Sequence, residues 1–81
     1  MIMNVGRICR IVKGKDAGKY CAVVSKLGRR DKNFVLIEGV GVKRRKMNTL
    51  HLEPLPPVLE IEKSTEADAV VNALKEKGFV N

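Results

Sequence analysis

Glycines divide the first forty-one residues into runs that are too short for helices. They stand at positions 6, 14, 18, 28, 39 and 41, and the segments between them are rich in β-branched residues. Glycine adopts backbone angles that other residues avoid, so this spacing marks turns between short strands. No window before residue 60 shows the apolar period of an amphipathic helix. The sequence therefore predicts a mainly β fold and excludes a helical bundle.

Five short strands follow from this division, at residues 5–12, 20–27, 34–38, 42–47 and 50–52. Short strands joined by tight turns are typical of a small closed or nearly closed barrel. Closure also hides edge strands that would otherwise pair with other chains. We expect a five-stranded barrel over residues 1–53.

Three prolines, Pro54, Pro56 and Pro57, follow the last predicted strand. Because proline cannot donate a hydrogen bond to a sheet, we expect the barrel to end before them. An extended, proline-rich connector is predicted over residues 54–63.

Residues 64–78 are predicted to form a C-terminal helix. Ser64 or Thr65 can cap its start, and Gly78 can end it. Its apolar face consists of Ala67, Val70, Val71 and Leu74. Such a helix is marginal alone in water, so we expect it to dock on the barrel or, alternatively, on a neighbouring protein.

The two halves of the chain carry opposite net charges. Residues 1–52 hold thirteen Lys and Arg against Asp16, Asp31 and Glu38, a net charge of +10, whereas residues 53–81 have a net charge of −3. This asymmetry indicates that the first half faces a polyanion, and nucleic acid is the commonest one in the cytoplasm. Charge that only keeps the protein soluble is the alternative interpretation.

Catalytic and metal-binding patterns are missing from the sequence. His51 is the only histidine, no serine has a recognisable histidine–carboxylate partner, and neither a P-loop nor G-x-G-x-x-G is present. We therefore expect no enzymatic activity, no cofactor, no metal site and no small-molecule substrate. The chain also has no apolar stretch long enough for a signal peptide or a membrane span, so a cytoplasmic location is expected.

The two cysteines, Cys9 and Cys21, do not form a C-x-x-C cluster. We interpret them as small buried hydrophobic residues in a reducing compartment. A cross-strand pair remains the alternative, because a hairpin turning near Asp16 would bring them together. Asp16 itself lies in a glycine-rich turn, where its side chain is expected to bond to the backbone.

Basic side chains cluster in three places. Four consecutive cations, Lys43 to Lys46, lie on a predicted strand, which sends Lys43 and Arg45 to one face and the other two to the opposite face. We interpret these four cations as a site that binds the RNA backbone. A solvated edge strand is the alternative interpretation. The predicted RNA-contact residues are Lys13, Lys15, Lys19, Arg29, Arg30, Lys32, Lys43, Arg44, Arg45, Lys46 and His51.

Two glycines, Gly14 and Gly18, are predicted to shape the first turn so that backbone N–H groups can approach a phosphate. Only three aromatic residues occur in the chain, too few for a platform that stacks on single-stranded bases. Recognition is therefore expected to depend on phosphate, sugar and shape.

Four ordered motifs resemble a known family. They are Gly-Arg-Ile-Cys at residues 6–9, Asp-Ala-Gly-Lys at 16–19, Lys-Arg-Arg at 43–45 and His-Leu-Glu-Pro at 51–54. The first two, with the strand at residues 34–37, resemble the KOW motif. The whole set is similar to the archaeal and eukaryotic large-subunit ribosomal protein family called L-fourteen-e. The connection at residues 39–41 looks shorter than in much of that family.

This resemblance implies an SH3-like barrel that binds large-subunit ribosomal RNA through the loop at residues 14–19 and the strand at residues 43–46. It further implies a structural constituent of the cytoplasmic ribosome with neighbouring ribosomal proteins as partners, and we expect a monomer outside the ribosome. A KOW module of a transcription or translation factor is the alternative. A peptide-binding adaptor would need an aromatic groove that this chain cannot build.

Overall fold

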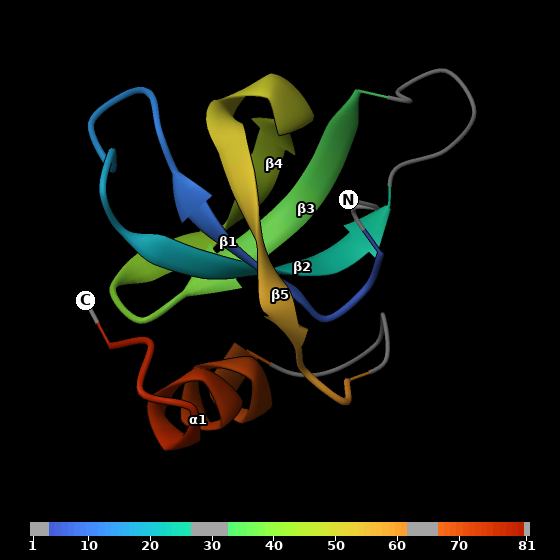
Figure 1. Ribbon diagram of the computed structural model, residues 1–81, viewed down its shortest axis with the longest axis vertical. Coiled ribbons are helices and arrows are strands. Elements are labelled where there is room, and N and C mark those ends of the chain that lie inside the picture. The colour runs from blue at the N-terminus through green and yellow to red at the C-terminus, as the bar shows by residue number, and fades with distance from the viewer. Residues whose placement is uncertain (1–3, 27–32, 62–66, 81) are drawn as a thin grey trace.

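The computed structural model describes residues 4–26, 33–61 and 67–80, which form one curved sheet and one helix (Figure 1). The elements in chain order are β1 (Arg7–Ile11), β2 (Tyr20–Lys26), β3 (Phe34–Gly39), β4 (Val42–Asn48), the short 3-10 helix η2 (Thr49–His51), β5 (Leu52–Val58) and α1 (Ala67–Glu76). The predicted fold class, mainly β with five strands and one C-terminal helix, is confirmed.

All pairings in the sheet are antiparallel, and the strand order is β4-β3-β2-β1-β5. The first four strands thus form a meander, and β5 returns to lie beside β1. Among the described strands no ladder joins β4 to β5, so complete closure of the barrel stays a prediction. Strong curvature nevertheless brings residues from all five strands into one interior core.

The interior core is made of small and medium apolar side chains. Its members are Cys9, Ile11, Cys21, Val23, Val35, Ile37, Val42, Met47 and Leu52. A second core lies on the outer face of the sheet, where Ala22 and Val24 meet the helix. The apolar run at the centre of β2 is therefore explained by burial on both faces of the strand.

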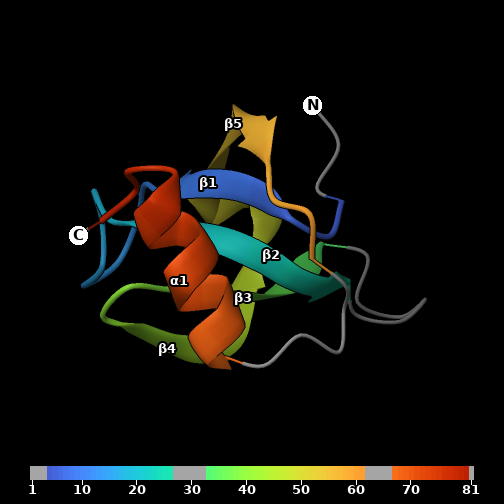
Figure 2. The same cartoon turned by 90° about the horizontal axis from the view of Figure 1, so that it is seen from below.

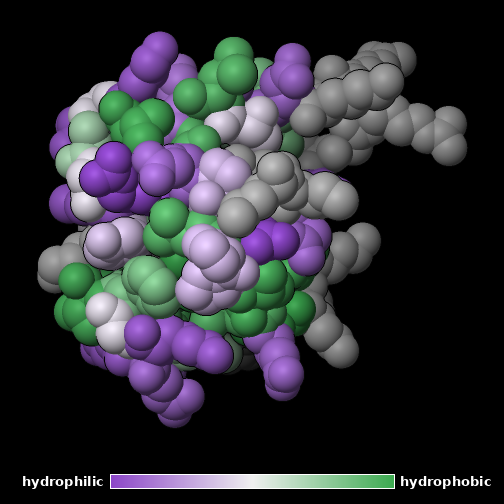
Figure 3. Space-filling model, in the orientation of Figure 1, coloured by the Kyte–Doolittle hydropathy of each residue, from purple (hydrophilic) through white to green (hydrophobic). Residues whose placement is uncertain are grey.

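Helix α1 covers the outer face of the sheet, crossing β2 and β3 (Figure 2). Val70 and Leu74 are fully buried against Ile8, Ala22, Val24 and Leu59. Val71 is only partly buried, so the buried stripe is narrower than predicted. Hydrophilic side chains cover the outer side of the helix (Figure 3). The predicted caps Ser64 and Thr65 lie outside the described residues.

Gly78 ends the helix in the predicted place. With φ at +85°, its N–H bonds the carbonyl of Lys75 at 3.0 Å, and the N–H of Phe79 bonds the carbonyl of Leu74 at 2.9 Å. This pair of bonds is the Schellman motif. Phe79 is thereby placed against the outer core, where its ring meets Tyr20 edge-on at 5.1 Å.

The prediction that the sheet ends before Pro54 is wrong, because β5 runs through all three prolines to Val58. The N–H of Val12 donates to the carbonyl of His51 at 2.8 Å, which sets the alternation of the ladder between β1 and β5. Pro54, opposite Cys9, then falls on a position whose nitrogen faces away from β1. Since β5 is an outer strand of the described sheet, the missing donor of Pro54 costs no ladder bond.

Arg7 supports the same proline segment from β1. Its Nη1 donates to the carbonyls of Leu55 and Pro56, both at 3.0 Å. Beyond the strand, the N–H of Leu59 donates to the carbonyl of Gly6 at 2.7 Å, and Leu59 is buried. The connector predicted at residues 54–63 is therefore, in its first half, part of the sheet.

The prediction of a brief strand at residues 50–52 is also wrong for Leu50 and His51. Residues Thr49–His51 form the 3-10 helix η2, whose start is capped by the Asn48 side chain accepting from the N–H of Leu50 at 2.9 Å. Leu50 consequently points outward and is 77% exposed.

Candidate nucleic-acid interface

The turn between β1 and β2, residues 12–19, is held by a small set of backbone bonds. The N–H groups of Ala17, Gly18 and Lys19 donate to the carbonyls of Gly14, Ile11 and Asp16 at 3.2, 2.7 and 3.0 Å. Gly14 and Gly18 have φ near +90°. A Cβ at either glycine would meet no atom within 4 Å. Both glycines are thus needed for the backbone conformation, and they leave the outside of the turn open.

The open side of this turn is rich in hydrogen-bond donors. The backbone N–H groups of residues 13–16 bond to no acceptor within the described part of the chain. Lys13 and Lys15 are exposed beside them. Adjacent N–H groups in a tight turn, with lysines alongside, are a suitable cradle for a phosphate oxygen.

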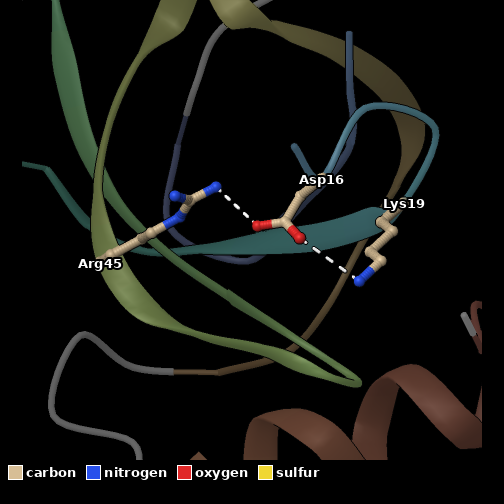
Figure 4. A network of polar contacts seen from close by, with 3 residues as sticks. All are labelled: Asp16, Lys19 and Arg45. Atoms are coloured by element: carbon tan, nitrogen blue, oxygen red, sulfur yellow. Dashed lines mark hydrogen bonds and ion pairs between the residues drawn. The ribbon is translucent and has the colours of Figure 1, made fainter. Parts of the chain in front are cut away.

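Asp16 links this turn to β4. Its Oδ2 accepts from Nη2 of Arg45 at 2.8 Å, and its Oδ1 lies 3.3 Å from Nζ of Lys19 (Figure 4). The prediction that the Asp16 side chain bonds to the backbone of its turn is therefore wrong. The first turn and the basic strand, whose lysines and arginines the sequence suggested could converge, are joined by an ion pair.

Arg45 lies on the interior face of the sheet, opposite Ile37 in the ladder of β3 and β4. Its Nε is buried and has no hydrogen-bond partner among the described residues. The guanidinium therefore extends from the edge of the core toward Asp16.

Arg44 pairs with Glu38 on the other face. Nη2 of Arg44 lies 2.9 Å from Oε1 of Glu38, and the Glu38 side chain is only 8% exposed. Two of the three acids in the basic half thus each bond a β4 arginine. This pairing explains how four consecutive cations fit on a strand next to a small core.

The remaining predicted contact residues are distributed unevenly. Lys43 is exposed, whereas Nζ of Lys46 lies 4.5 Å from the ring centre of Phe34 in a cation–π contact. His51 is partly buried in η2 and touches the start of the first turn through the Val12 bond described above. Arg29, Arg30 and Lys32 lie outside the described residues.

Two features of this region were missed in the sequence. Arg10 forms an exposed ion pair with Glu53 at 3.4 Å, and Leu50 projects into solvent next to His51. Neither has a local signal, because the first depends on the pairing of β1 with β5 and the second on the 3-10 turn.

Metal and membrane features are not observed in the described residues. They contain no group of three or more His, Cys, Asp or Glu side chains that could hold a metal ion. None of their helices is long and apolar enough to cross a membrane.

The KOW motif matches residues 5–38, which include β1, the first turn, β2 and nearly all of β3. With its curved antiparallel sheet and basic turn, the chain is a KOW-motif protein.

Relatives that match nearly the whole chain show the family. Large ribosomal subunit protein eL14 of Metallosphaera sedula is 43% identical over 99% of this chain and 84% of the relative. The protein of the same name from Saccharolobus islandicus is 41% identical over 98% of this chain and 83% of the relative. The chain belongs to the eL14 family of large ribosomal subunit proteins.

This membership confirms the family that the sequence motifs indicated. It also confirms the prediction of a structural, non-enzymatic ribosome constituent located on the ribosome.

Proposed function

We propose that this protein binds large-subunit ribosomal RNA through the β1–β2 turn and the basic side chains around it, and so stabilises the folded RNA of the subunit. The observation that carries the proposal is the run of unbonded N–H groups at residues 13–16, next to two exposed lysine side chains. Phosphate oxygens match this arrangement in charge and in hydrogen-bonding capacity.

The contribution of each cation depends on what it already bonds. Lys13, Lys15 and Lys43 are exposed and available to phosphates. Lys19 and Arg45 share the carboxylate of Asp16, so they add less to the net positive potential than their number suggests. Arg29, Arg30 and Lys32 stay predicted contacts.

His51 and Lys46 complete the proposed surface. The backbone of His51 is bonded to the start of the turn, and its ring can stack on a ribose or base. The ammonium of Lys46 lies over the ring of Phe34. Contacts with neighbouring ribosomal proteins and a monomeric state outside the ribosome also stay predictions.

Salt dependence of binding tests the proposal. The purified protein is titrated with a structured large-subunit ribosomal RNA fragment at a series of salt concentrations. Each phosphate contact is expected to contribute about −0.7 to −0.9 to the slope of log affinity against log salt. A matched uncharged matrix serves as the control. Binding that does not change with salt, or that is no stronger than to the matrix, would contradict the proposal.

A further inference from the structure

We propose that Asp16 and Arg45 are positioning residues, which hold the β1–β2 turn in the shape that receives phosphate, and that Arg45 is not itself a phosphate ligand. This inference rests on the proposed function. It assigns to an acid in the middle of the basic surface a role that favours RNA binding.

The geometry ties the turn to a distant strand. Arg45 and Asp16 are 29 residues apart in sequence, and their side chains meet at 2.8 Å. The Asp16 side chain is only 14% exposed and that of Arg45 is 36% exposed, so the contact is partly shielded from solvent. A shielded bond between a guanidinium and a carboxylate is stronger than an exposed one, because less water competes for it.

Both oxygens of the carboxylate are engaged by cations, as Figure 4 shows. The charge of Asp16 is therefore directed at Arg45 and Lys19. Without these partners the carboxylate would repel an incoming phosphate. With them the carboxylate holds Asp16 in place, at the end of the run of unbonded N–H groups at residues 13–16.

The same contact makes Arg45 unsuitable as a phosphate ligand. Its Nε is buried without a partner among the described residues, and one terminal nitrogen is bound to Asp16. The planar fork that makes arginine a good phosphate ligand is thus aimed at an acid of this chain.

The direction in which RNA affinity changes when the charge of Asp16 is removed separates this inference from an effect of net charge alone. Asp16→Asn raises the net charge by one and nearly preserves the shape of the side chain. If charge alone governs binding, affinity for the RNA fragment rises. If Asp16 positions the turn, affinity falls, by about fivefold for a contact pair of ordinary coupling strength.

Glu53→Gln is the matched control. This variant also removes one negative charge that is paired with an arginine, Arg10. The Glu53 side chain, however, is 53% exposed. Unchanged or slightly tighter binding is expected for this variant. If Asp16→Asn tightens binding in the same way, the inference is overturned.

Two substitutions of Arg45 complete the test. Arg45→Lys keeps the net charge, yet it is expected to weaken binding because an ammonium lacks the guanidinium fork. The double variant Arg45→Met/Asp16→Asn is expected to bind RNA as weakly as the single variants Arg45→Met and Asp16→Asn, because all three lack the same contact. Unchanged RNA affinity of Arg45→Lys, or additive effects in the double variant, would overturn the inference.

A measurement without RNA keeps this test distinct from that of the proposed function. Hydrogen exchange at the bonded amides of Ala17, Gly18 and Lys19 is expected to accelerate in Asp16→Asn and to stay unchanged in Glu53→Gln, with thermal unfolding confirming that both are folded. Unaltered exchange in Asp16→Asn overturns the positioning role directly. Salt-independent binding by the unaltered protein instead removes the proposed function, and this inference with it.

Discussion

Cys9 and Cys21 lie directly opposite each other on β1 and β2, both fully buried and both free thiols. The turn near Asp16 therefore does bring them together across the hairpin, while they serve as apolar members of the interior core. Burial raises the pKa of Cys9 to about 12, although nearby Arg7 acts in the opposite direction. Burial also raises the pKa of Cys21.

Both thiols are expected to react slowly in the folded protein. The thiolate is the reactive form, and burial disfavours it while also blocking reagents. Titration with a chromophoric disulfide should give almost no reaction under native conditions and two equivalents after denaturation. Rapid native reaction at both cysteines would contradict the burial seen here.

Alkaline pH is expected to lower stability through the same two groups. Each thiol has an ordinary pKa of 9.0 and a raised one in the fold, so from about pH 9 upward the unfolded chain loses a proton that the folded chain keeps. The stabilisation is fully present below pH 9 and falls by up to about 1.4 kcal/mol per pH unit for each cysteine. Denaturant unfolding of the protein and of its Cys9→Ala/Cys21→Ala variant, between pH 8 and 11, isolates this contribution. Parallel stability curves would refute it.

Two glycines with the same backbone angle provide a matched pair. Gly6 and Gly14 have φ of +92° and +90°, but a Cβ at Gly6 would clash with the carbonyl of Leu59, whereas one at Gly14 would meet nothing. Gly14→Ala is expected to cost about 1–2 kcal/mol, the conformational penalty alone. Gly6→Ala must add a steric penalty and displace the segment after β5. Equal losses in thermal unfolding would show that this close approach is unimportant.

Two ion pairs on the outer face of the sheet should differ in strength, because they differ in exposure to solvent. Arg44→Met leaves the buried carboxylate of Glu38 without its guanidinium, an expected loss of about 1–3 kcal/mol. Arg10→Met breaks a pair whose side chains are about half exposed, and less than about 1 kcal/mol is expected. Chemical unfolding of both variants measures the difference. A smaller loss of stability for Arg44→Met than for Arg10→Met would contradict the prediction that the less exposed pair contributes more.

The strands were predictable because their signals are local. Glycines, β-branched runs and the turn at residues 14–18 mark β1 to β4 within one or two residues at each end. Gly78 likewise marks the end of α1. These features depend on backbone geometry that a short stretch of sequence determines.

Features that depend on a distant partner were not predictable. The proline strand is allowed only because β5 pairs with β1 in a register that turns the Pro54 nitrogen outward. The contact of Asp16 with Arg45 requires the curvature of the whole sheet, since nothing near Asp16 in sequence indicates it. The basic clusters were found from sequence, but their division into paired and exposed cations was not.

Lys13 and Lys15 are expected to account for a measurable part of the salt dependence of RNA binding. Both are exposed on the open side of the turn, and neither forms an ion pair within the described residues. Replacing both with glutamine should make the log–log salt slope shallower by about 0.7–0.9 for each phosphate that the variant no longer binds. Lys75→Gln/Lys77→Gln is the control of equal charge, because those lysines lie at the end of α1, on the outer face of the sheet. If the two double variants change the slope equally, binding follows net charge and not the geometry of the turn.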